Sequence, residues 1–473
     1  MAVDQFGLDL SLATDAAPKA AGHWDATVRA FLAHGAETPV HLGNALDAAT
    51  HFPLAQACRG LFMLLLGRRE LVQTAREAYQ TVTTAAAELG VSAREQAYID
   101  ALGDWLGGHP LKAADRLDRC LCANPRDAMA LKVIHGIRFI MGDQPGMRRS
   151  IESVIDHYDA NHPASGYVQG CYAFALEETG DQTRAEEFGR LALDRAPDDA
   201  WGLHAVAHVM EMQGRAEDGI GWVRSNEDAW THCNNFRFHV VWHLALFHLD
   251  QRDFARVLEL YDTEIRAEKT DDYRDFSNAA SLLSRLELEG VDTGNRWAEL
   301  IEIAENRIDD GSVVFADLHY LLALCQESGR GLAMTPYSGA ENLVSRMRKS
   351  SMTCASDMAR VAGAPGLDAA KGVAAFGCGN FAAAHAAFQR AVPDLIAIGG
   401  SHAQRDVFIR LAIEAAIRCK SLDAAETLIR NRTTLRGADD DFSRSRMSHI
   451  GDMRARSASR PTVNPLDYAV AVY

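Results

Sequence analysis

The chain has 473 residues, too many for one compact core, because cores stop growing near about 250–300 residues. Its composition, 48% hydrophobic and 24% charged, is that of an ordinary soluble protein. The net charge of −16 argues against a nucleic-acid binder, which needs a basic stripe. The sequence has no apolar run long enough to span a bilayer. We therefore expect neither nucleic acid nor a membrane as a partner.

The N-terminus and the cysteines bear on the cellular compartment. The first residues, MAVDQFGLDLSL, include acidic but no basic side chains, so they lack the basic region of a secretion signal. The nine cysteines are scattered, without a Cys-x-x-Cys pair. Reduced thiols are the simplest interpretation, and they favour a cytoplasmic location.

Short turns divide a sequence that is helical almost throughout, with apolar residues at three- and four-residue spacing. The turns recur every 34 to 41 residues, provided that one turn without glycine is centred on Arg252. Such a period indicates a repeat architecture. The turn centres are Gly67, Gly108, Gly142, Gly180, Gly214, Arg252, Gly290 and Gly329, with Gly379 in a later unit.

The clearest unit, residues 166–199, has Ala173 in its first helix, Gly180 at the turn and Pro197 after the second helix. This is the tetratricopeptide pattern, in which helix pairs stack into a solenoid whose concave face is lined mainly by the first helices. We therefore predict an all-α solenoid, as an open spiral or closed on itself. Its expected parts are a helical cap (1–50), tetratricopeptide-like repeats (51–330), further helical repeats (331–436) and an irregular tail (437–473).

Two His-x-x-x-His pairs stand on predicted first helices of neighbouring repeats. His204 and His208 are one helical turn apart, as are His239 and His243, so each pair shares one face of its helix. Apolar residues take the core positions of both helices, so the repeat register turns the histidines toward the concave groove. His319 takes the same position in a later repeat. The sequence therefore predicts a histidine-rich site in the groove.

A divalent metal centre is the sharpest hypothesis for this site. Neutral imidazoles bind zinc, iron or manganese, and His204, His208, His239 and His243 are the candidate ligands. Glu211 or His319 would be a further ligand or an outer contact. Alternatively, the pocket binds a small polar molecule or a peptide end without metal, with the histidines, Glu177, Glu178, Glu211 and Trp242 as contacts and one histidine available for acid–base chemistry. The third alternative is that the histidines only satisfy polar contacts between repeats.

Tyr98 and Arg405 are two more candidates for ligand contacts, beside Trp242. Tyr98 and Trp242 fall on groove-facing positions and could stack on a ligand, although aromatic packing between repeats explains them equally well. Arg405 lies in the polar start of a helix that follows a Gly-Gly turn, for which Ser401 is the expected N-cap. We favour an ion pair that braces the C-terminal repeats for Arg405 over a contact to the ligand.

Several segments resemble the tetratricopeptide repeat protein 38 family, which includes StaR-like proteins of glycopeptide-antibiotic gene clusters. They are HAVAHVMEMQGR, NNFRFHVVWHLALFHLD, LLSRLELEGV, FADLHYLLA and GGSHAQRDVF, and the resemblance extends from about Gly7 to Arg430. It implies a helical-repeat fold with histidines on its inner surface. The matching positions are His204, His208, Glu211, His239, Trp242, His243, His319, Gln404, Arg405 and Asp406. The chain departs from the family at Asn278, where Asp is usual, and at Tyr98, where His is frequent.

Three classes of function follow from these observations. The first is a helical-repeat protein whose pocket binds a small polar ligand, a peptide end or a divalent metal. The second is a metal-dependent oxidative, hydroxylase-like enzyme of small-molecule metabolism, as the resemblance implies. The third is a scaffold for protein partners. The sequence leaves open whether copies of the chain associate into a homo-oligomer.

Overall fold

The computed structural model describes residues 2–12, 17–326, 338–353 and 355–458. Apart from a short hairpin of β1 (Ala2–Val3) and β2 (Asp9–Leu10), its regular structure is helical. The N-terminal half contains α1 (Ala17–Leu32), α2 (Thr38–Ala48), α3 (Pro53–Leu65), α4 (Leu71–Leu89), α5 (Ala93–Leu106), α6 (Pro110–Ala123), α7 (Ala128–Ile140), α8 (Gln144–Glu152), η1 (Ile155–His157), α9 (Ser165–Glu178), α10 (Gln182–Arg195), α11 (Ala200–Met212), α12 (Ala216–Ser225) and η2 (Glu227–Ala229).

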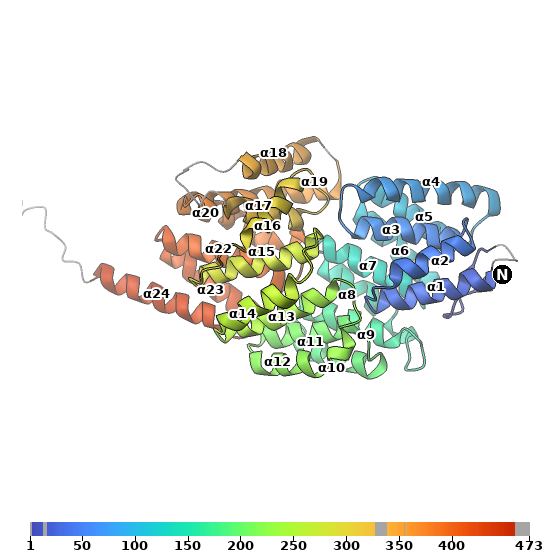
Figure 1. Ribbon diagram of the computed structural model, residues 1–473, viewed down its shortest axis with the longest axis horizontal. Coiled ribbons are helices and arrows are strands. Elements are labelled where there is room, and N and C mark those ends of the chain that lie inside the picture. Colours follow the sequence, from blue (N-terminus) through green and yellow to red (C-terminus); the bar gives the residue numbers. More distant parts are fainter. Residues whose placement is uncertain (1, 13–16, 327–337, 354, 459–473) are drawn as a thin grey trace, which may run out of the picture.

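The C-terminal half continues the same succession of helices, which Figure 1 shows from green to red. It contains α13 (Phe236–Asp250), α14 (Phe254–Leu260), η3 (Tyr261–Ile265), α15 (Tyr273–Leu288), α16 (Trp297–Asn306), α17 (Val314–Gln326), α18 (Ser338–Thr353), α19 (Asp357–Val361), η5 (Ala362–Gly366), α20 (Leu367–Gly377), α21 (Phe381–Ala391), η6 (Val392–Ile398), α22 (His402–Arg418), α23 (Leu422–Arg436) and α24 (Asp441–Ala458). The predicted all-α solenoid of stacked helix pairs is confirmed.

Within the central repeats, the first helix of a pair forms an inner layer and the second an outer layer. Every residue of α9 is buried, whereas α10 buries only Ala185, Gly189 and Ala192. The same contrast separates α11 from α12 and α22 from α23. A helix that is buried all round lies inside the protein, and one with a single apolar stripe covers it. The predicted groove-lining helices are therefore the interior of the molecule.

The turns between paired helices adopt the left-handed backbone conformation that closes such hairpins. Arg252, expected to replace glycine at one turn, has φ 60°, in line with the glycines at the other described turns. Lys420, between α22 and α23, has φ 65°, a turn that the glycine pattern could not reveal. Gly329 lies outside the described residues.

Lys420→Gly should stabilise the protein, because a side chain in the left-handed region costs about 1 kcal/mol that glycine avoids. Lys420 is exposed, so no buried contact is lost. We expect the free energy of unfolding in urea to rise by about 0.5–1 kcal/mol. Lys420→Ala is the control, because alanine keeps the Cβ. An equal gain in the alanine variant would contradict this explanation.

The solenoid closes on itself through contacts between residues far apart in sequence. The His402 backbone N–H donates to Glu178 Oε1 at 2.7 Å, joining α22 to α9. Arg436 Nη2 donates to the Glu211 carbonyl oxygen at 2.6 Å, joining α23 to α11. The Asp357 N–H donates to the Gly108 carbonyl oxygen at 2.9 Å, so the N-terminal repeats contact the C-terminal ones as well. The groove is thus covered instead of open.

The C-terminal segment differs from the expected irregular tail. Residues 441–458 form α24, which packs on α23 and projects at the left of Figure 1. Arg446 holds it against earlier repeats by ion pairs with Glu289 and Glu414. Phe442 and Ile450 also bury their side chains against apolar residues of α22 and α23, so the helix has an apolar face as well. Residues 459–473 lie outside the described part.

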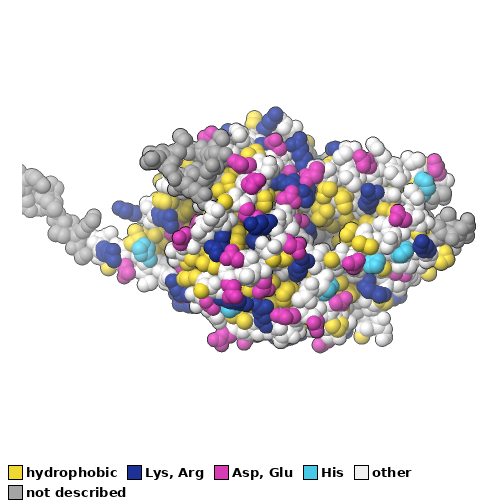
Figure 2. All heavy atoms as spheres, viewed as in Figure 1, with side chains coloured by type: hydrophobic (Ala, Val, Ile, Leu, Met, Phe, Trp, Pro, Cys, Tyr) yellow, Lys and Arg dark blue, Asp and Glu magenta, His cyan; other side chains and the backbone are white. Residues whose placement is uncertain are grey.

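The surface and the helices bear on possible partners. On the face that Figure 2 shows, acidic and basic side chains are interspersed and form no basic stripe. Among the described helices, none has the length and apolar character that crossing a membrane requires.

Candidate metal centre

Two neighbouring inner helices, α11 and α13, position the four histidines. The Asp199 side chain caps α11 by accepting from the Gly202 backbone N–H at 3.1 Å. Both helices end at left-handed turns, at Gly214 and Arg252. The four-residue spacing of each pair then places its two rings one above the other on the face that meets the other helix.

The four rings converge on one point inside the protein. His204 Nε2 lies 3.0 Å from His239 Nε2 and 2.9 Å from His208 Nε2. One nitrogen from each of the four histidines, His243 included, lies within 4.8 Å of the others, a separation that one metal ion can bridge. His204, His208 and His243 are at most 2% exposed, and His239 is half-buried. The predicted convergence of these side chains is present.

Hydrogen bonds orient two of the rings through their other nitrogen, and a carboxylate lies near that nitrogen of a third. His239 Nδ1 lies 2.9 Å from Asn278 Oδ1, and His243 Nδ1 lies 3.1 Å from Glu211 Oε2. His208 Nδ1 faces Glu177 Oε2 at 3.6 Å. Carboxylate and amide oxygens behind the Nδ1 atoms are the arrangement that fixes metal-bound histidines, because they direct the Nε2 lone pairs toward the ion.

These contacts assign the protons of the cluster. Since an amide or carboxylate oxygen accepts, His239 and His243 donate from Nδ1, and a neutral ring has only one N–H. Their Nε2 atoms are therefore bare acceptors, and His243 Nε2 has no hydrogen-bond partner among the described residues. His204 Nε2 lies near both His239 Nε2 and His208 Nε2, but it carries at most one hydrogen and so can donate only one hydrogen bond to this pair. Lone pairs that face each other in a buried site repel, and a cation removes that repulsion.

Burial keeps the rings neutral. It lowers the pKa of His239 to about 4 and holds the pKa values of His204, His208 and His243 well below the usual histidine value. Neutral imidazole is the form that binds metal. Burial, together with Glu178 and Glu211, also raises the pKa of Glu177, neither of whose carboxylate oxygens forms a hydrogen bond with the described residues.

Aromatic side chains enclose the cluster. The Trp242 ring stacks on His239, with centroids 5.2 Å apart, and the Phe174 ring stacks on His204 at 5.5 Å. Trp201 lies 5.0 Å from His204. This wall limits the access of water to the imidazoles. Trp242, predicted to contact a ligand, is fully buried against the cluster.

The other predicted site residues lie in four different places. Glu177 and Glu211 adjoin the cluster, as described above. His319 is buried on α17 between Phe315 and Phe408, and its Nε2 has no partner among the described residues. Arg405 forms the favoured bracing ion pair, with Glu178 at 3.1 Å.

The contacts of Tyr98 place its side chain away from the four histidines. Its hydroxyl donates to Asp127 Oδ1 at 2.8 Å, and the same carboxylate pairs with Arg94 at 2.6 Å. This buried network joins α5 to the N-terminal cap of α7. The structure therefore does not bring Tyr98 to the histidines.

Two contributors were not identified as such from the sequence. Asn278 was noted only as a departure from the family, yet it holds His239. Arg436 lies in the second helix of a late repeat, and its guanidinium lies 3.6 Å from the Glu211 carboxylate. Only the closure of the solenoid brings α23 to this point, and the repeat pattern does not encode that closure.

Fold and site together define an all-α protein of tetratricopeptide-like helical repeats with a buried cluster of four histidines. No family model matches the chain. The chain is similar to the crystal structure of yeast Tom70, at 10% identity and TM-score 0.34, over 94% of this chain and 91% of that one.

Two further solved structures are similar. One is Naa15/Naa10 bound to HypK-THB, at 12% identity and TM-score 0.25, over 93% of this chain and 66% of that one. The other is the P58(IPK) TPR domain, at 14% identity and TM-score 0.20, over 76% of this chain and 90% of that one. These similarities concern the helical-repeat fold.

Proposed function

We propose that the protein binds one divalent transition-metal ion through His204, His208, His239 and His243. The observation that carries the proposal is the convergence of four nitrogens inside the protein, with oxygen acceptors behind three of the rings. Imidazole ligands suit zinc, iron and manganese. Glu177 and Glu211 lie directly behind the ligands, where their carboxylates can balance the charge of a dication.

Metal analysis of the full chain, purified without chelator and without a polyhistidine tag, tests the proposal. We expect about one equivalent of zinc, iron or manganese per chain. Chelation should lower the melting temperature, and re-addition of the ion should restore it, because a ligand at 1,000 times its Kd stabilises a protein by about 4 kcal/mol. Substoichiometric metal, with no thermal shift for any of the three ions, would refute the centre.

The resemblance to the tetratricopeptide repeat protein 38 family supports a finer proposal, an oxidative reaction of a small molecule at the bound ion. Oxygen consumption by the metal-containing chain in the presence of a candidate substrate tests it. Binding of a peptide end without metal and a scaffold role are the competing proposals. The first predicts a retained ligand but no metal, and loss of that ligand without the four imidazoles; the second predicts that the protein functions equally well without them.

The proposed cellular location is the cytoplasm. This proposal is supported by the described cysteines, none of which forms a disulfide, as their scattered spacing predicted. A homo-oligomer stays a prediction that sedimentation of the full chain can test.

A further inference from the structure

A second group of metal-ligating side chains adjoins the four histidines and shares one of them. Glu177 and Glu178 are the last two residues of α9, where the helix dipole favours a cation. One carboxylate oxygen from each lies, together with one nitrogen of His208, within 4.8 Å of the others. All three residues are at most 4% exposed. Their donor atoms are thus close enough together to bind a single ion.

The two ring nitrogens of His208 face different groups. Its Nε2 lies 2.9 Å from His204 Nε2, inside the four-histidine cluster, whereas its Nδ1 lies 3.6 Å from Glu177 Oε2. That second separation is too long for a hydrogen bond, and Nδ1 has no hydrogen-bond partner among the described residues. Since both ring nitrogens of histidine bind metals, this ring can contact two ions, one at each nitrogen.

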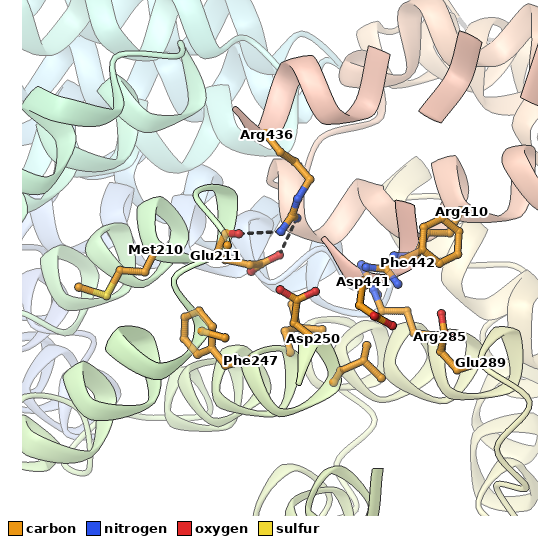
Figure 3. A pocket seen from close by; sticks show the side chains of 14 residues that line it. Met210, Glu211, Phe247, Asp250, Arg285, Glu289, Arg410, Arg436, Asp441 and Phe442 are labelled. Atoms are coloured by element: carbon orange, nitrogen blue, oxygen red, sulfur yellow. Dashed lines mark hydrogen bonds and ion pairs between the residues drawn. The ribbon is translucent and has the colours of Figure 1, made fainter. Parts of the chain in front are cut away.

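Glu177 has the fewest partners of the three carboxylates around the cluster. Glu178 pairs with Arg405 at 3.1 Å, and Glu211 faces Arg436 at 3.6 Å, as Figure 3 shows. In the described part of the chain, Glu177 has no arginine or lysine within ion-pair distance, and neither of its oxygens forms a hydrogen bond. A buried carboxylate without such contacts is costly, and direct binding of a cation removes that cost.

We propose that Glu177, Glu178 and His208 Nδ1 bind a second divalent ion, zinc or manganese, so that the His208 ring bridges two ions. The proposal deepens the metal centre proposed above and rests on it, because both ions use His208. Mixed carboxylate and imidazole ligands suit zinc and manganese. The second ion takes the place of the proton that Nδ1 holds when Nε2 binds the first ion, and this proton is released to solvent.

The second ion should bind more weakly than the first. Three side chains hold it instead of four, and a neighbouring cation repels it. Glu178 also keeps its other contacts, to the His402 backbone N–H at 2.7 Å and to Arg405. We therefore expect the second ion to be lost during purification and to be taken up again from a solution that contains zinc or manganese.

Equilibrium dialysis of the metal-free full chain against an excess of zinc, or of manganese, tests the proposal. We expect two bound ions per native chain. Glu177→Gln removes a ligand of the second ion and leaves all four ligands of the first, so it should bind one. Glu187→Gln, at an exposed position of the neighbouring helix α10, is the matched control and should bind two.

The numbers of bound ions separate the two proposals. One ion in the native chain, unchanged in Glu177→Gln, would overturn the second site and leave the four-histidine centre intact. No bound ion in the native chain would overturn both. Two ions in Glu177→Gln would overturn the assignment of Glu177 as a ligand.

Electron paramagnetic resonance of the native chain loaded with manganese gives a readout that does not depend on the folding of a variant. Two manganese ions that share one imidazole ring interact magnetically, so the spectrum should lose the resolved hyperfine lines of isolated manganese. Loading the first site alone should keep those lines. Isolated-ion lines at two bound manganese ions per chain would overturn the bridging role of His208.

Discussion

Replacing His208 with alanine is expected to abolish stoichiometric metal binding. His208 Nε2 lies 2.9 Å from His204 Nε2, and its ring is fully buried, so no solvent-exposed side chain can substitute for it. We expect metal content to fall from about one equivalent to less than a tenth of that. His243→Ala should behave in the same way. Elemental analysis of the purified variants measures both effects.

His248→Ala is the matched control, because His248 stands on the same helix as His243 but faces Asp253 at 3.5 Å, outside the cluster. It should keep the metal. Glu211→Gln tests the outer contact, since loss of such a partner lowers metal affinity about 10–100-fold. If His208→Ala retained one equivalent, or if His248→Ala lost it as well, the assignment of the ligands would be incorrect.

Replacing Arg432 with methionine is expected to cause the largest loss of stability. The guanidinium, almost completely buried, donates to Asp406 at 2.6 and 2.9 Å and to Asp440 at 2.8 and 2.6 Å. Removal of one member of a buried network leaves charges without a partner, at a cost of about 3–5 kcal/mol. Urea unfolding of the variant and of the native chain measures this cost.

Arg430→Met provides the comparison, because Arg430 stands on the same helix, is 71% exposed and pairs only with Glu426. An exposed pair is worth at most about 1 kcal/mol. Equal unfolding midpoints for the two variants would show that the buried network does not stabilise the closure of α22, α23 and α24.

The same network predicts the pH dependence of stability. Burial alone would raise the pKa of Asp440, but Arg432 and Arg410 hold it well below its usual value. The pKa of Asp440 is thus lower in the folded protein than in the unfolded chain, where it is about 3.9. Its ion pairs therefore stabilise the folded protein fully above about pH 3.9, and this stabilisation is lost as the pH falls toward the pKa of the folded protein. In Arg432→Met, acid unfolding should therefore begin at a higher pH than in the native chain.

The amino-acid sequence predicted the repeats and the histidines because both depend on short-range periodicity. The turn spacing indicated the helix pairs, and it placed Arg252 at a turn that the backbone angle confirms. The i, i+4 spacing placed each imidazole pair on one face. The spacing of residues within each helix, together with the repeat register, was sufficient to infer that His204 and His239 approach each other.

The closure of the solenoid could not be predicted in this way. It depends on contacts such as that between His402 and Glu178, more than 200 residues apart, which no periodic pattern encodes. Tyr98 was assigned to the groove by register alone, without knowledge that Asp127 would bind its hydroxyl. The sequence did not predict helix α24 because serine and arginine dominate its segment, although Phe442 and Ile450 form a buried apolar face and Arg446 pairs with Glu289 and Glu414.

The covering of the inner helices by α22 and α23 has a kinetic consequence for any ion bound at the four imidazoles. Glu178 and Glu211, next to the ligands, are held by segments that the ribosome makes more than 200 residues later. An ion therefore reaches the fully buried imidazoles most readily before these last segments dock, or during their transient opening. Its residence time is set by how often the C-terminal helices detach, and not by the strength of the metal–nitrogen bonds alone.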